Sequence, residues 1–145
     1  MASEEYVSEA EPAMTGHSFK VETFDACVQC HPFPELLTQF AMASTANKIA
    51  QVKSALDLWA TTKAPEALRT KYGALAWEFT TPGSLSTGTP GPSATEQNQI
   101  PEAIKKARFN VYLATYDGSF GVHIPLHTVK LLDSALALIQ QELNK

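Results

Sequence analysis

Two cysteines and a histidine lie close together in the stretch DACVQCHP. Cys27 and Cys30 are separated by two residues, and His31 follows directly. Thiols at this spacing project from one helical turn and can reach the two vinyl groups of a single porphyrin, while the adjacent imidazole can bind the iron as an axial ligand. The pattern therefore predicts one covalently attached c-type haem, with His31 as its proximal ligand.

Two other chemistries use cysteines at this spacing. A structural zinc site needs four good ligands, but the sequence has no third cysteine, and only His17, His123 and His127 remain as further imidazoles. A CxxC thiol–disulfide pair is expected beside a βαβ pattern, which the sequence does not show. The haem interpretation is favoured over both alternatives.

The second axial position decides whether the iron is closed for electron transfer or open to small ligands. The candidates are His17, His123, His127, Met14 and Met42. Met42 is expected to pack in the core, and His127 is expected to be exposed in the first turn of a helix. His123 lies in a loop between two apolar helices, just before Pro125, and is the preferred distal ligand.

Helical periodicity dominates the rest of the chain. Apolar residues recur at helical spacing after Ser44 and Thr45, over residues 65–81, over 101–116 and over 125–143. The first of these stripes consists of Ile49, Val52, Leu56 and Trp59. No stretch alternates as a half-buried strand does. The prediction is an all-α helical bundle of about four longer helices plus a short haem-attachment helix.

Two segments have compositions that do not build a core. Residues 1–15 are polar and acidic, which predicts a flexible N-terminal arm. Residues 81–99 are rich in Pro, Gly, Ser and Thr and are predicted to form a flexible loop. Neither of the two segments that flank this loop is expected to fold by itself, so residues 16–145 are expected to form a single haem domain.

Charge and hydropathy exclude some functions and suggest a location. The chain has 11 Lys and Arg against 15 Asp and Glu, which is unlike the basic patch of a nucleic-acid-binding protein. No apolar run is long enough to span a bilayer. Because haem is normally attached outside the bacterial cytoplasm, we expect a periplasmic or extracellular protein whose leader is missing from this sequence.

Two stretches resemble the C-terminal region of multihaem c-type cytochromes, in the group related to ammonia-forming cytochrome c nitrite reductase. They are GHSFKVETFDACVQCH (residues 16–31) and ARFNVYLATYDGSFGVHIPLHTVKLLDSAL (residues 107–136). The group has a histidine shortly before a late CxxCH motif and another in a DGxxGxHNP loop, and His17 and His123 match these two positions. The loop also matches at Asp117, Gly118, Gly121 and Pro125. Ile124 stands where the group usually has Asn.

The resemblance implies that His17 and His123 are both axial ligands of haems, although not necessarily of the haem attached nearby. His17 is accordingly the alternative distal ligand. The chain departs from those relatives because its two cysteines allow only one haem and no CxxCK motif is present. Nitrite reduction by this chain alone is therefore not expected.

The preferred function is single-electron transfer by a low-spin bis-histidine haem of low potential, with redox proteins as partners and no catalytic residue. Side chains expected to line the haem pocket or to pack in the core are Phe24, Phe33, Phe40 and Trp59. One alternative is a subunit of a haem-chain assembly, in which a spare histidine binds the haem of a neighbouring subunit. Another is a sensor or enzyme whose iron has an open sixth site.

Overall fold

The structure is a computed structural model that describes residues 24–25, 27–79, 91–117, 119–122 and 125–145. The chain divides into two compact units, Met1–Glu35 and Leu36–Lys145, and each is considered by itself. The predicted arm over residues 1–15, and its boundary with the haem domain, lie outside the described residues. The division between the units falls near the start of the first helix.

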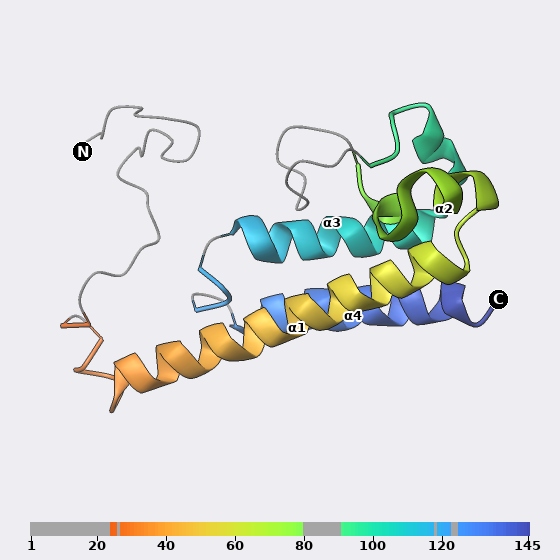
Figure 1. The fold of residues 1–145 in the computed structure, drawn as a ribbon. Coiled ribbons are helices and arrows are strands. Elements are labelled where there is room, and N and C mark those ends of the chain that lie inside the picture. The colour runs from red at the N-terminus through yellow and green to blue at the C-terminus, as the bar shows by residue number, and fades with distance from the viewer. Residues whose placement is uncertain (1–23, 26, 80–90, 118, 123–124) are drawn as a thin grey trace, which may run out of the picture. The chain divides into compact units, whose positions relative to one another are not determined.

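Within the described residues, four α-helices and two short 3-10 helices make up the regular structure. They are α1 (Pro34–Thr62), α2 (Glu66–Tyr72), η1 (Gly73–Trp77), η2 (Glu96–Gln99), α3 (Glu102–Tyr116) and α4 (Pro125–Leu143). The described residues include no strand, which confirms the predicted all-α class (Figure 1). None of the described helices is long and apolar enough to cross a membrane.

The helix boundaries follow from local sequence. Proline begins α4 and immediately precedes α3, in agreement with its fixed φ and missing N–H donor. The α1 helix begins at Pro34, well before the Ser44–Thr45 start that the sequence predicted. The stretch after Pro34 is rich in good helix formers, with Glu35 in the first turn, so the helix extends through Ser44 without a new cap.

The second predicted helix is interrupted. The expected helix over residues 65–81 ends as an α-helix at Tyr72 and continues as the 3-10 helix η1. Gly73 adopts a φ of +54°, a left-handed conformation in which the α-helix cannot continue. The apolar stripe that predicted one helix is thus divided between two elements.

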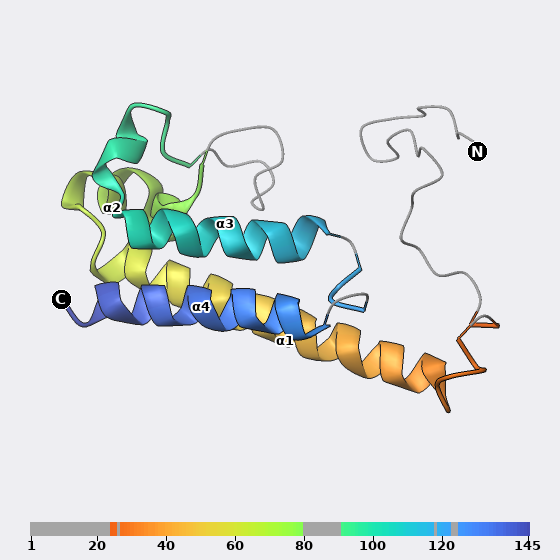
Figure 2. The same ribbon diagram turned by 180° about the vertical axis from the view of Figure 1, so that it is seen from behind.

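The core of the second unit lies between α1, α3 and α4. These helices run side by side, as the views from both sides show (Figures 1 and 2). All four residues of the first predicted stripe are buried: Ile49, Val52, Leu56 and Trp59. Side chains from the other two helices complete the cluster, including Ile104, Ala107, Val111, Leu132, Ala135 and Ile139. Lys48 of α1 and Asp133 of α4 form an ion pair at the rim.

Part of the predicted flexible loop is folded. Residues 80–90 lie outside the described residues, but 91–99 contain the helix η2 and the buried residues Gly91, Pro92 and Gln97. The Gln97 side-chain amide donates to the carbonyl oxygens of Glu78, at 3.0 Å, and Pro92, at 2.9 Å. A polar side chain therefore ties the two flanks of this segment together, an arrangement that composition alone does not reveal.

Two leucines of α1 allow a matched test of the core. Leu56 is completely buried, whereas Leu58 is 51% exposed. Leu56→Ala should lower the free energy of unfolding by about 2–5 kcal/mol, because it removes apolar contacts and leaves a cavity. Leu58→Ala should change it by only about 0.5 kcal/mol. Urea unfolding followed by circular dichroism measures both, and equal losses would contradict the described core.

Candidate haem-attachment site

The cysteine–histidine motif forms hydrogen-bonded turns. The amide of Val28 donates to the carbonyl oxygen of Phe24 at 3.2 Å, and the amide of His31 donates to that of Cys27 at 2.9 Å. Both bonds join residues four apart, as in an α-helix, although the segment is too short to count as one. In place of the predicted short haem-attachment helix, the described residues thus form turns of helical type.

The two cysteines and the histidine have the spacing of one helical turn. Positions i, i+3 and i+4 of a helical turn share one face, and these are the positions of Cys27, Cys30 and His31. The two sulfur atoms are not joined in a disulfide. Cys27 is half-buried, while Cys30 and His31 are exposed, so an incoming group can reach the turn.

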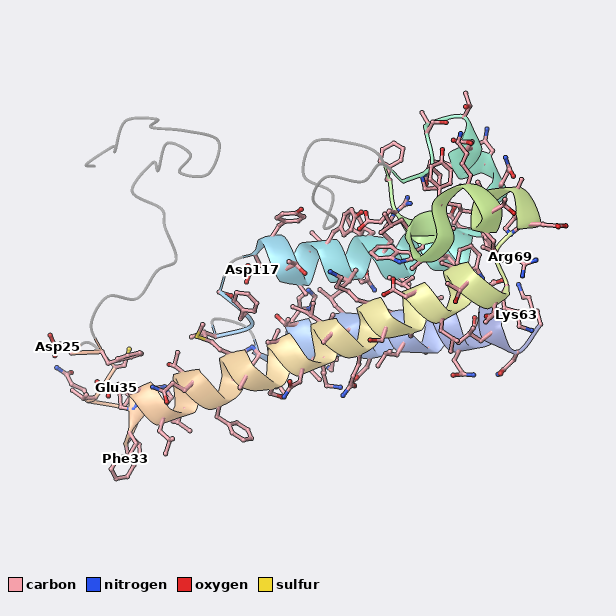
Figure 3. All side chains as sticks on the ribbon, in the orientation of Figure 1. Asp25, Phe33, Glu35, Lys63, Arg69 and Asp117 are labelled. Carbon is pink, nitrogen blue, oxygen red and sulfur yellow. The ribbon has the colours of Figure 1, made fainter. Side chains whose placement is uncertain are left out.

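The residue between the motif and α1 has an unusual backbone. Phe33 has a φ of +59°, and it precedes Pro34, which normally holds its neighbour in an extended conformation. Its side chain is 77% exposed and points away from the surrounding chain (Figure 3). A left-handed non-glycine residue costs about 1–2 kcal/mol, and such strain is found most often at functional sites.

The aromatic residues predicted to line a pocket have different surroundings. In the first unit, Phe24 is half-buried and Phe33 is exposed. In the second unit, Phe40 is 75% exposed in the early part of α1, together with Leu36 and Leu37. Trp59, by contrast, is a buried residue of the core cluster. Packing therefore accounts for Trp59 without a haem.

The candidates for the distal ligand are only partly described. His17, His123 and Met14 lie outside the described residues. His127 is exposed in the first turn of α4, as the sequence predicted. Met42 is also exposed, so the expectation that it packs in the core is wrong. The reason is that the buried stripe of α1 begins only at Thr45.

The loop before His123 is fixed by close packing. Gly121 has a φ of +79°, and a Cβ atom at this position would lie 2.8 Å from Oγ1 of Thr45 and 3.4 Å from Cβ of Thr128. Two further bonds shape the loop: Ser119 Oγ donates to Asp117, and the amide of Val122 donates to the carbonyl oxygen of Ser119 at 3.1 Å. Gly121 thus lies directly against residues of α1 and α4.

The threonines at this packing site were not anticipated from the sequence. Thr45 was expected near a helix start and Thr128 had no assigned role, yet both are buried. Only the glycine of the loop gave a signal, since glycine is the residue that tolerates both a positive φ and close backbone approach. Its packing partners depend on how α1 and α4 meet, which the local sequence does not specify.

Comparison of the chain with protein-family models, with curated proteins and with solved structures finds no match. Among the described residues, no three His, Cys, Asp or Glu side chains are grouped so that they could hold a metal ion by themselves. The description of the site therefore depends on the motif, its backbone and its surroundings.

Two glycines with positive φ allow the stability cost of backbone strain to be distinguished from the cost of a packing clash. Gly121→Ala introduces both a strained φ and a clash with Thr45, and we expect it to destabilise the fold by about 2–4 kcal/mol. Gly73→Ala meets no atom within 4 Å, so only the backbone strain at its φ of +54° and ψ of −128° remains, about 1–3 kcal/mol. Chemical unfolding of both variants gives the comparison. An equal cost would mean that the loop does not pack on Thr45 as described.

Proposed function

We propose that this protein is a monohaem c-type cytochrome that carries single electrons. In this proposal, the haem is bound through thioether bonds to Cys27 and Cys30, and His31 is the proximal ligand of its iron. The observation that supports the proposal is the backbone hydrogen bond from His31 to Cys27, which is of the helical type, because positions i, i+3 and i+4 of a helical turn lie on one face. When bound, the haem supplies an iron that alternates between the ferric and ferrous states.

The residues of the first unit suit this group. Two thiols and one imidazole are the donor set that covalent haem attachment requires. The exposed ring of Phe33 and the half-buried ring of Phe24 offer apolar surface next to the motif in the sequence. A porphyrin is a large apolar ligand that could cover such side chains.

We assign the distal position to His123, with His17 as the alternative. The assignment is supported by the resemblance of its loop to DGxxGxHNP. If His31 and His123 both held the haem, its iron would have no open position for a substrate, so the proposed role is that of an electron carrier and not of an enzyme. Bis-histidine ligation also favours a low-spin iron of low potential.

The proposed location is periplasmic or extracellular, since this is where c-type haems are normally attached. The proposed partners are redox proteins, without nucleic acid. The formal net charge of −4, to which two haem propionates would add, favours partners with a basic docking surface.

The attachment is tested by producing the chain in cells that contain haem-maturation machinery. The purified protein should show the sharp absorption bands of a low-spin haem in both redox states. Cys27→Ser/Cys30→Ser should lose covalent haem while keeping the helical circular dichroism of the second unit, whose core contains neither cysteine. An unchanged content of covalent haem in this variant would overturn the proposal.

The distal ligand is tested with a matched pair of histidines. His123→Ala should turn the iron high-spin and allow the ferrous protein to bind carbon monoxide, because the sixth position opens. His127→Ala removes an exposed imidazole in the first turn of α4 and should leave the spectrum unchanged. A high-spin spectrum in His17→Ala alone would show that His17, and not His123, is the distal ligand.

A further inference from the structure

Three aromatic rings form a line that begins in the core of the second unit. The rings of Trp77 and Tyr112 have centroids 6.4 Å apart, and those of Tyr112 and Tyr116 are 6.1 Å apart, both in edge-to-face contact. Trp77 is buried, Tyr112 is half-buried and Tyr116 is 56% exposed. The line therefore runs from the interior to the surface along α3.

The middle ring has a proton acceptor in direct contact. The Tyr112 hydroxyl donates to a carboxylate oxygen of Glu78, a residue that is only 1% exposed. Arg108 holds this stretch of backbone in place, since its guanidinium donates to the carbonyl oxygens of Trp77, at 2.8 Å, and Glu78, at 3.1 Å. Burial, and then the hydrogen bond to Glu78, raise the pKa of the Tyr112 phenol. The phenol thus keeps its proton at neutral pH.

We propose that Tyr112 is a redox-active tyrosine, with Glu78 as its proton acceptor and Tyr116 as the outlet to the surface. Its oxidant is a strong metal-centred one-electron oxidant supplied from outside the chain, and the role of the aromatic line is to carry the oxidising equivalent from Tyr112 to the surface at Tyr116. The inference stands on the second unit alone and does not depend on the haem.

The reaction is a coupled transfer of one electron and one proton. Tyr112 gives an electron to the oxidant, whose metal is reduced by one unit, while its O–H bond breaks and the proton bonds to the Glu78 carboxylate. The products are a neutral tyrosyl radical and a neutral carboxylic acid, so no new charge is buried. Tyr116 then gives an electron to the radical and its own proton to water, and the proton on Glu78 returns to Tyr112.

A second tyrosine–carboxylate pair provides the control. The Tyr72 hydroxyl donates to Glu96 at 2.6 Å, but Glu96 is already paired with Lys71 at 2.8 Å. Hydrogen bonds from Lys71, Ser93 and Tyr72 hold the pKa of Glu96 well below its usual range. Glu96 is therefore a weaker proton acceptor than an ordinary carboxylate. Ring contacts of the kind that link Tyr112 to its neighbours are not found for Tyr72 in the described part of the chain.

The test uses the full chain, photo-oxidised with tris-bipyridyl ruthenium(III), frozen and examined by electron paramagnetic resonance. In Tyr116→Phe, where Tyr116 cannot hold the radical, the sample should give a tyrosyl radical signal that the further change Tyr112→Phe strongly weakens and the further change Tyr72→Phe keeps. Tyr116→Phe should prolong the Tyr112 radical, because its outlet is removed. A signal unaffected by Tyr112→Phe, or abolished by Tyr72→Phe, would overturn the proposal.

The role of Glu78 is tested by Glu78→Gln, which keeps the size of the side chain but accepts a proton poorly. This variant should lower the yield of the radical, whereas Glu96→Gln should leave it unchanged. If Glu78→Gln does not fold, the wild type in D₂O replaces it, and formation of the radical should be slower there than in H₂O. Equal rates in the two solvents would show that proton transfer to Glu78 is not coupled to the oxidation.

Discussion

The second unit depends on burial of one face of α1. Removal of apolar surface from water is the main favourable term in folding, and in this unit it is concentrated where α1 meets α3 and α4. Val52 and Leu56, at the middle of that face, are completely buried. The same contact positions the loop at Gly121, because its packing partners Thr45 and Thr128 belong to α1 and α4.

The fold was largely predictable from periodicity. The stripe from Ile49 to Trp59 and the proline-led helices α3 and α4 are strong local signals, and the structure has helices at all three places. Local sequence signals did not predict two features, the early start of α1 and the break in the helix at Gly73. The first lacks a cap and depends on helix propensity over several turns, and the second depends on a single backbone conformation.

The chemistry proposed for the candidate site comes from the sequence, whereas its setting comes from the structure. The spacing of Cys27, Cys30 and His31 is by itself the pattern of c-type haem attachment, so the haem prediction needed no tertiary information. The strained φ of Phe33 could not be foreseen because it depends on where α1 begins. The exposure of Met42 depends on where the buried stripe of α1 begins, which is at Thr45. The pairing of Tyr112 with Glu78 joins residues 34 positions apart, which no local pattern anticipates.

The central claim is that the turn from Cys27 to His31 holds a covalent haem. The most direct measurement is the intact mass of the denatured protein after production in cells that contain haem-maturation machinery. We expect a single species that is heavier than the polypeptide by one haem. In Cys27→Ser/Cys30→Ser we expect a chain of unmodified mass. A wild-type chain without the added mass, from cells that mature another c-type cytochrome normally, would contradict it.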